Sequence, residues 1–169
     1  IIELEMPFEG KRGIYQIKHP FIQFWFAQIY KHYSDYAARK PAFIENLKKN
    51  LNNAYGKAFE NLAKEFLKNK LSLQEARRQW GKIQGAKKGE NTYEIDCMGK
   101  NEKNVYAFEI KWKKLSYPEA ITILKNLKTK TSYLNQKITN LKLGIVAKKI
   151  EGKQKLRTEG YLAFDLEDF

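Results

Sequence analysis

The chain has 169 residues, of which 43% are hydrophobic, which is enough for one domain with a hydrophobic core. Its single cysteine, Cys97, excludes a disulfide framework and a cysteine-based metal site, and favours a reducing, cytoplasmic setting. No apolar run approaches membrane-spanning length, so no membrane partner is expected. A net charge of +13 favours polyanionic partners, nucleic acid ahead of anionic membranes, although lysine-rich surfaces also serve solubility.

The N-terminal part predicts an extension that precedes the main domain. Residues 1–17 alternate weakly and predict two short strands joined by a turn. Apolar residues then occupy nearly every side of a helix at Phe21–Tyr30, and such a helix should be buried or covered by a partner. We assign residues 1–52 to a linker and helical extension and residues 53–169 to the main domain. The first residue is Ile1 rather than Met, which suggests a piece of a longer protein.

Two helices are expected next, separated by a break. Pro41 fits the first turn of a short helix, and Asn52, Asn53 and Gly56 should break or bend the chain behind it. The second helix is amphipathic, and Glu60 borders its apolar stripe. Gly56 leaves room one turn earlier, so Glu60 could point toward the sheet as an outer metal ligand or a water-positioning group. The alternative is an ordinary solvent-facing glutamate.

The remaining chain predicts three strands, a crossover helix and two further strands. The strands are expected at Gln79–Gln84, Tyr93–Met98, Val105–Trp112, Leu141–Ile150 and Tyr161–Leu166. Ser116 should cap the crossover helix, and Pro118 fits its first turn. Its core face comprises Ala120, Leu124, Leu127 and Leu134. This order predicts an α/β fold with a mixed central sheet flanked by helices.

The hairpin formed by the second and third strands carries the chemistry. Side chains alternate along a strand, so Glu109 and Lys111 share one face with Val105 and Ala107, and the opposite face is a core face. Asp96 is expected on the face opposite Ile95 and Cys97, where hairpin pairing can bring it beside Glu109. Two carboxylates and a lysine would then converge.

Such a group has the components that phosphodiester hydrolysis needs. Asp96 and Glu109 supply hard oxygen ligands for Mg²⁺ or Mn²⁺. Lys111 can orient the attacking water and offset the developing negative charge. The alternative interpretation is a solvated charge pair on a half-exposed strand.

Lysines supply the expected nucleic-acid surface. Between Tyr117 and Leu143 the single acid is Glu119, so this segment is the densest candidate for contacts with phosphates. The residues expected to bind nucleic acid are Lys87, Lys88, Lys113, Lys114, Lys125, Lys128 and Lys130.

Asp96 followed by Glu109-Ile110-Lys111 resembles the signature of the PD-(D/E)XK nuclease superfamily. Nearly the whole chain looks like the C-terminal nuclease-like domain that follows archaeal P-loop ATPase modules, known as domain of unknown function 234. The matching segments are Tyr15–Phe26, Gly56–Glu60, Trp80-Gly81, Glu94–Asp96 and Phe108–Trp112. His19 departs from the acidic residue expected before that proline.

The resemblance implies a restriction-endonuclease-like sheet with an N-terminal helical extension, and a metal-dependent DNA endonuclease. It places Glu60, Asp96, Glu109 and Lys111 at catalytic positions. Winged-helix and P-loop ATPase modules would lie upstream as partners, and this chain contains no P-loop sequence itself. The alternative is a non-catalytic DNA-binding or docking module of an ATPase, because a fold does not determine a function. Homodimerisation is left open.

Overall fold

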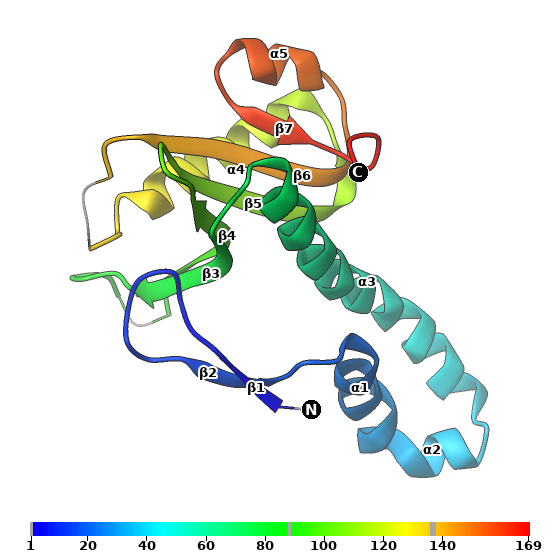
Figure 1. Ribbon diagram of the computed structural model, residues 1–169. Coiled ribbons are helices and arrows are strands. Elements are labelled where there is room, and N and C mark those ends of the chain that lie inside the picture. Colours follow the sequence, from blue (N-terminus) through cyan, green and yellow to red (C-terminus); the bar gives the residue numbers. More distant parts are fainter. Residues whose placement is uncertain (1, 88, 136–137) are drawn as a thin grey trace.

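The structure is a computed structural model that describes residues 2–87, 89–135 and 138–169 (Figure 1). Its strands are β1 (Ile2–Glu5), β2 (Ile14–Ile17), β3 (Glu75–Lys82), β4 (Thr92–Lys100), β5 (Val105–Leu115), β6 (Leu141–Ile150) and β7 (Leu162–Phe164). Its α-helices are α1 (Pro20–Phe24), α2 (Tyr33–Ala37), α3 (Pro41–Lys70), α4 (Tyr117–Thr131) and α5 (Lys153–Thr158). A π-helical turn, η1 (Trp25–Ile29), and a 3-10 turn, η2 (Tyr30–His32), connect α1 to α2.

The central sheet has five strands in the order β3-β4-β5-β6-β7. β3, β4 and β5 are antiparallel neighbours, whereas β6 and β7 run parallel to β5. A parallel neighbour requires a crossover connection, and α4 supplies it between β5 and β6. The predicted succession of three strands, a crossover helix and two strands is therefore confirmed, as is the α/β class with a mixed sheet.

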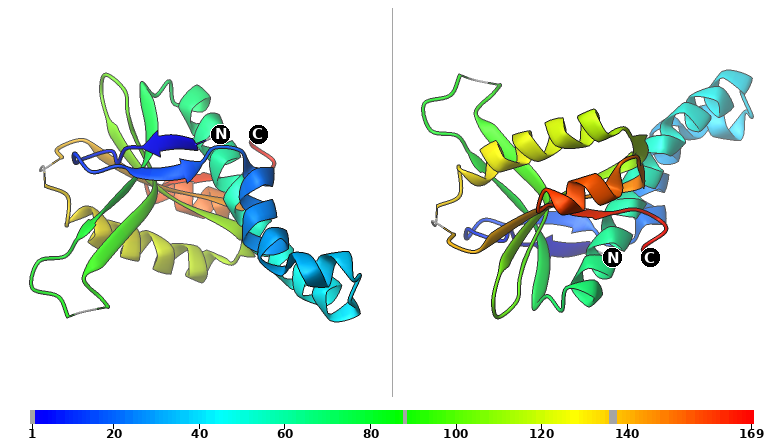
Figure 2. Two further views of the ribbon diagram at one scale, coloured as in Figure 1. Left: turned by 90° about the horizontal axis from the view of Figure 1, so that it is seen from below. Right: turned by 90° about the horizontal axis from the view of Figure 1, so that it is seen from above.

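α3 and α4 cover opposite faces of this sheet (Figure 2). Along β5, Phe108 and Ile110 pack on the α3 side, whereas Ala107 packs on the α4 side. The helices contribute Phe59, Ala63 and Leu67 of α3, and Ala120, Leu124 and Leu127 of α4. Since side chains alternate along a strand, Glu109 and Lys111 belong to the α4 face of β5, together with Ala107 as predicted.

Ser116 caps α4, as predicted. Its backbone N–H and its hydroxyl both donate to Oε2 of Glu119, at 2.9 and 2.8 Å. The capping box is reciprocal, because the side chain of Ser116 also accepts from the backbone N–H of Glu119, and it satisfies groups that would otherwise lack a partner at the helix start. Leu134 lies beyond the end of α4 at Thr131, but it still packs against the α4-side core.

α3 is one continuous helix of 30 residues, where the sequence predicted two. The break expected at Asn52, Asn53 and Gly56 is wrong. A glycine inside a helix costs about 1 kcal/mol relative to alanine, and each large buried side chain such as Phe59 or Leu67 contributes roughly 2 kcal/mol or more. The burial of these side chains therefore outweighs the cost of Gly56.

The predicted domain boundary between residues 52 and 53 falls inside this helix and stays a prediction. No helix within the described ranges, α3 included, is long and apolar enough to cross a membrane.

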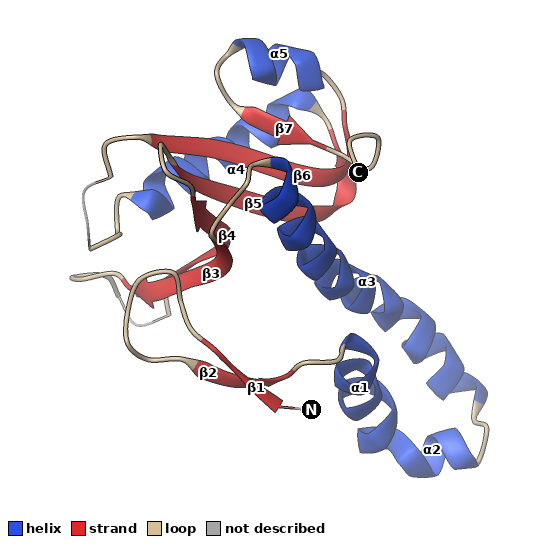
Figure 3. Cartoon of the chain, in the orientation of Figure 1, coloured by secondary structure: helices blue, strands red, loops and turns tan. Residues whose placement is uncertain are grey.

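β1 and β2 form a separate two-stranded ribbon, as predicted, and α1 and α2 lead from it to α3 (Figure 3). Within residues 20–37, all of which the structure describes, Ile29 is the single buried residue. Phe21, Phe26 and Tyr30 are exposed, and the rings of Phe26 and Tyr30 contact each other edge to face. Of the two alternatives predicted for this apolar segment, burial in the chain's own core is therefore not met, and a covering partner stays a prediction.

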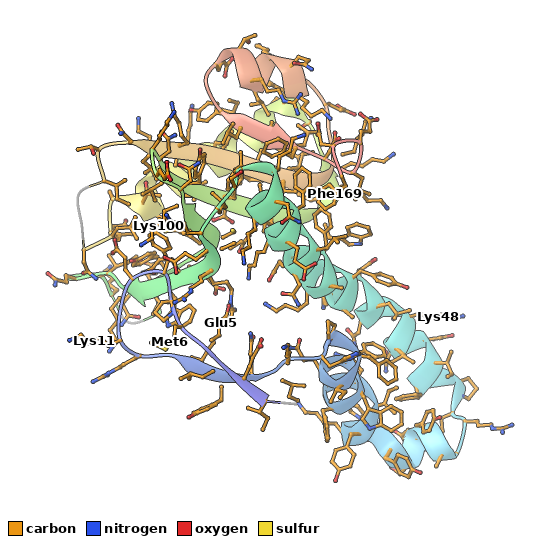
Figure 4. The ribbon with its side chains drawn as sticks, viewed as in Figure 1. Glu5, Met6, Lys11, Lys48, Lys100 and Phe169 are labelled. Atoms are coloured by element: carbon orange, nitrogen blue, oxygen red, sulfur yellow. The ribbon has the colours of Figure 1, made fainter. Side chains whose placement is uncertain are left out.

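An ion pair fastens the ribbon to the sheet. Nε of Arg78 in β3 lies 3.0 Å from both carboxylate oxygens of Glu5, whose side chain lies between the ribbon and the sheet (Figure 4). Burial alone would raise the pKa of Glu5, but the Arg78 guanidinium outweighs it and lowers that pKa. The backbone N–H of Phe8 also donates to the carbonyl of Arg78 at 2.9 Å.

α5 was not predicted, because its six residues contain one buried apolar side chain, Leu156, and therefore no helical periodicity. Asp165, which follows β7, holds this region together. Its buried carboxylate accepts hydrogen bonds from the backbone N–H of Ile150 at 3.1 Å and from Nζ of Lys153 at 2.6 Å. This carboxylate thus joins the residue after β7 to the end of β6 and to the first residue of α5.

Candidate active site

Polar side chains meet at the point where β4 and β5 separate. The pairing of these strands runs from Lys100 opposite Val105 to Cys97 opposite Phe108. Immediately past it, Oδ2 of Asp96 accepts a hydrogen bond from the backbone N–H of Ile110 at 2.8 Å. A carboxylate of β4, rather than one of its carbonyls, therefore binds β5 at this position.

A β-bulge aims Asp96 at this position. Arg77 lies opposite Met98 and Gln79 lies opposite Ile95, so Arg78 faces two residues of β4, Asp96 and Cys97. An extra residue of this kind interrupts the alternation of side chains and re-aims one of them. Ile95 accordingly packs on the α4 side and Cys97 on the α3 side. The prediction that Ile95 and Cys97 share a face is wrong, because periodicity does not reveal a bulge.

Asp96, Glu109 and Lys111 converge as predicted. Nζ of Lys111 lies 2.7 Å from Oδ2 of Asp96 and 2.7 Å from Oε2 of Glu109. β6 supports this end of β5, since Glu109 lies opposite Ile145 and Lys111 lies opposite Ala147 in the parallel pairing. The lysine thus bridges two carboxylates on a strand that is paired on its other side.

Lys130 joins this group from α4, the helix that covers this face of the sheet. Its Nζ lies 2.7 Å from Oε1 of Glu109, so each oxygen of this carboxylate accepts from a different ammonium group. The lysine content of this segment predicts Lys130 as a phosphate contact and does not predict its neighbour Glu109. The signal for this position was present in the sequence, because Lys130 follows the core residue Leu127 by three positions and therefore borders the inward face of the helix.

The two carboxyl groups differ in their electrostatics. The side chain of Glu109 is 4% exposed, and burial, followed by repulsion from Asp96, raises its pKa. Burial would also raise the pKa of Asp96, but Lys111 and the Ile110 N–H outweigh it and lower that pKa. Burial opposes the charge of Lys111, yet both carboxylates together raise its pKa. The group therefore combines a stabilised carboxylate, a destabilised carboxylate and a firmly charged lysine.

The donor chemistry of this group fits a hard divalent cation. Mg²⁺ is commonly held by one or two carboxylates, with waters and substrate phosphates as its other ligands. Asp96 and Glu109 offer such a pair, joined through Lys111. Within residues 2–87, 89–135 and 138–169, no group of three or more His, Cys, Asp or Glu side chains is placed to hold a metal ion.

Glu60 lies on α3, outside the hydrogen-bonded group. Its Oε2 accepts from Nζ of Lys57 on the same helix at 2.8 Å. The neighbouring Phe59 packs on Trp112 near the end of β5, with ring centroids 5.1 Å apart. A Cβ at Gly56 would lie 3.9 Å from Cβ of Trp112, so this turn of α3 rests on β5 at Trp112, beyond Glu109 along the strand. Its role in catalysis stays a prediction.

Most of the lysines predicted to bind nucleic acid are exposed. These are Lys87, Lys113, Lys114, Lys125 and Lys128. Nζ of Lys113 lies 3.2 Å from Oε1 of Glu119, and both side chains are open to solvent, so this pair is easily exchanged. Lys88 lies outside the described residues. Lys130 is half-buried, for the reason given above.

Two sequence comparisons find similar proteins. The model of the DUF234 family, described as "Archaea bacterial proteins of unknown function", matches residues 25–123. The uncharacterized protein MJECL04 of Methanocaldococcus jannaschii is 34% identical over an alignment of 171 positions, and the alignment covers 95% of this chain. The match covers 36% of that protein, so the chain spans little more than a third of the length of this relative.

Among solved structures, the chain is similar to the protein in "Structure of EndoMS-dsDNA2 complex". The alignment covers 64% of this chain and 43% of the other, at 15% sequence identity and a TM-score of 0.34. A likeness at this level establishes neither a shared fold nor a shared function.

Proposed function

The chain belongs to the DUF234 family of archaea bacterial proteins of unknown function, and we propose that it is a metal-dependent endonuclease that hydrolyses DNA phosphodiester bonds. The observation that carries this proposal is the convergence of Asp96, Glu109 and Lys111 where β4 and β5 separate. A mixed sheet with this site at its centre agrees with the restriction-endonuclease-like architecture expected from the sequence.

The burial of Glu109 favours a function for the group. A carboxylate withdrawn from water is costly unless it is matched by charges, and ion pairs of this kind are rarely the most stable choice for a core. Perturbed titratable groups that cluster in this way are common at catalytic sites. The bulge at Asp96 also supports a function, because it aims the carboxylate at Lys111 and interrupts the pairing of β3 with β4.

Each residue has a distinct role in the proposed mechanism. Asp96 and Glu109 hold the divalent cation, which when bound supplies a water of lowered pKa and neutralises charge on the scissile phosphate. Lys111 orients the attacking water and stabilises the negative charge that develops on the phosphate oxygens. Glu60 lies on α3, which covers the other face of the sheet from Glu109 and Lys111, and in this proposal it positions water from the outer side of the site.

DNA contacts in this proposal come from the exposed lysines. Most of these lysines lie on the same elements as the site residues. α4 carries Lys125 and Lys128, and the end of β5 carries Lys113 and Lys114. Contacts between lysines and phosphates give affinity without base readout. The proposed enzyme therefore binds duplexes independently of DNA sequence. We also propose that it acts in the cytoplasm, because its single cysteine suits a reducing setting.

A second candidate function is a DNA-binding or docking module without catalysis. The observation that favours it is that both oxygens of Glu109 already accept from ammonium groups, so the site is balanced without a metal. Either candidate function suits the same proposed partners. These are winged-helix and P-loop ATPase modules elsewhere in a longer protein, and a second copy of this chain in a homodimer.

Cleavage assays on several DNA forms test the proposal. Supercoiled plasmid, linear duplex and branched duplex are incubated with the protein and Mg²⁺, Mn²⁺ or a chelator. We expect cleavage of at least one form with metal, and none with the chelator. A protein that cleaves none of the three with either ion would leave only the non-catalytic function.

A further inference from the structure

Lys130 is held differently from the other cation of the site. Its side chain is 32% exposed, and it contacts the almost fully buried side chain of Glu109 from the last turn of α4. Lys111, in contrast, bridges Asp96 and Glu109 from a strand that is paired with β6. The side chain of Lys111 is exposed to a similar extent, at 34%, so the two lysines differ in their partners and not in their access to solvent. Lys130 has one carboxylate partner where Lys111 has two, and it is therefore the cation that can leave at the lower cost.

The charges of the group balance. The carboxylates of Asp96 and Glu109 face the ammonium groups of Lys111 and Lys130, and Lys130 occupies an oxygen that a divalent cation would need. Both ammonium groups repel such a cation across a few ångströms in a partly desolvated site. A divalent ion can bind tightly only if one of the lysines moves away from its carboxylate.

We propose that Lys130 is an exchangeable positioning residue, which holds Glu109 through an ion pair when no metal is present and pairs with a DNA phosphate instead when the metal binds. The inference rests on the proposed function. The phosphate that approaches the metal offers the displaced ammonium a new anionic partner, and exposed Lys125 and Lys128 on the same helix draw the duplex toward it.

One consequence is that metal and DNA bind cooperatively. The metal releases Lys130 from Glu109, and the DNA phosphate gives the released ammonium group a new partner. Each ligand therefore lowers the free-energy cost of binding the other, and such coupling between two binding events is reciprocal. The free protein should therefore bind a divalent ion weakly, and the duplex should strengthen that binding. This arrangement would keep the hydrolytic site unassembled until a substrate is present.

Calorimetric titration of the DNA-free protein with Mn²⁺ tests the exchange directly. In Lys130→Gln an amide N–H can still donate to Glu109, but the competing charge is gone, so Mn²⁺ should bind roughly tenfold more tightly than to wild type. Lys130→Arg keeps the charge and should stay within about twofold of wild type. Lys128→Gln removes an exposed charge two residues away on the same helix, and it should also stay within about twofold of wild type because solvent screens it.

The outcomes separate this inference from the proposed function. Equal Mn²⁺ affinity in Lys130→Gln and wild type would overturn the exchange and leave the metal site standing. No Mn²⁺ binding by either protein would remove the metal site itself. A tighter Lys130→Gln, with Lys128→Gln unchanged, is the expected result.

A second measurement needs wild type alone and therefore does not depend on whether a variant folds. Duplex affinity is measured by fluorescence anisotropy with and without Ca²⁺, which takes the same oxygen ligands, at constant ionic strength. The exchange predicts an affinity that rises at least about threefold with Ca²⁺. An unchanged or lower affinity would contradict it.

Discussion

Oδ2 of Asp96 lies 2.8 Å from the backbone nitrogen of Ile110, so a side chain joins two strands at the position where their backbones stop pairing. This contact gives Asp96 a structural task in addition to the proposed catalytic one. The two tasks can be separated by substitution.

Asp96→Asn should keep the fold and lose the metal. The amide oxygen can still accept from the Ile110 N–H, but it no longer supplies a charged ligand. Asp96→Ala loses both functions and should destabilise the protein by about 2 kcal/mol or more, because Ile110 and Lys111 lose a buried partner. Urea unfolding and Mn²⁺ calorimetry measure the two effects. If Asp96→Asn bound Mn²⁺ as wild type does, the metal assignment would be wrong.

Glu119 makes stability depend on acid pH. Its hydrogen bonds with the backbone N–H and hydroxyl of Ser116, together with Lys113, lower its pKa from 4.5 to about 2. Because the folded-state pKa lies below the unfolded one, this stabilisation is present above pH 4.5 and is lost as the pH falls toward 2. Wild type should therefore melt at a higher temperature than Glu119→Gln at pH 6, and the difference should shrink as the pH falls from 4.5 toward 2. A difference that does not change with pH would contradict the capping role.

Two glycines should respond in opposite ways to alanine. A Cβ at Gly144 of β6 would lie 2.1 Å from Cε1 of Phe108, a fully buried ring, so Gly144→Ala should cost about 3 kcal/mol. A Cβ at Gly56 of α3 would meet Cβ of Trp112 at 3.9 Å, so Gly56→Ala should add about 0.5–1 kcal/mol of helix stability. Chemical unfolding of both variants measures the contrast. A neutral Gly144→Ala would show that β6 does not approach Phe108 this closely.

The salt dependence of DNA binding locates the basic surface. Replacing both Lys125 and Lys128 with glutamine should flatten the slope of log affinity against log salt by about two units. For each phosphate contact that is lost, about one counterion stays bound to the DNA instead of being released. Fluorescence anisotropy on one duplex at several salt concentrations measures the slope. An unchanged slope would move the surface to Lys87, Lys113 and Lys114.

The sheet and the core of the site were predictable from local patterns. Alternation along residues 105–112 assigns the two faces of β5, and that assignment places Glu109 and Lys111 together. The turn residues between β4 and β5 identify a hairpin, which brings Asp96 from a distant position in the sequence. These features depend on neighbours along the strand or across one turn, which is the range that sequence periodicity covers.

Other features depend on the whole fold and were missed. Lys130 reaches Glu109 only because α4 crosses over the sheet before β6, and the bulge at Asp96 is a property of pairing with β3. The continuity of α3 through Gly56 reflects packing against β5 and not helix propensity. Each of these outcomes was decided by long-range contacts that outweigh local preferences.

Lys111→Met removes the cation that bridges both carboxylates, and Lys114→Met is its matched control because Lys114 lies on the same strand and is exposed. In the proposed enzyme, Lys111 acts on the attacking water and the developing charge, whereas duplex affinity depends mainly on other lysines. Melting temperature and duplex affinity, measured on the same preparations, report whether each variant is folded and able to bind.

The most direct test of the active-site assignment is the rate at which supercoiled plasmid is cleaved at a fixed Mn²⁺ concentration by wild type, Lys111→Met and Lys114→Met. At protein concentrations that saturate the plasmid, where the loss of one phosphate contact no longer limits the rate, the active-site assignment predicts that wild type and Lys114→Met cleave at similar rates. It predicts that Lys111→Met, folded and bound to DNA, is slower by a factor on the order of a hundred or more. A Lys111→Met protein that cleaves as fast as wild type, or a wild type that does not cleave at all, would contradict it.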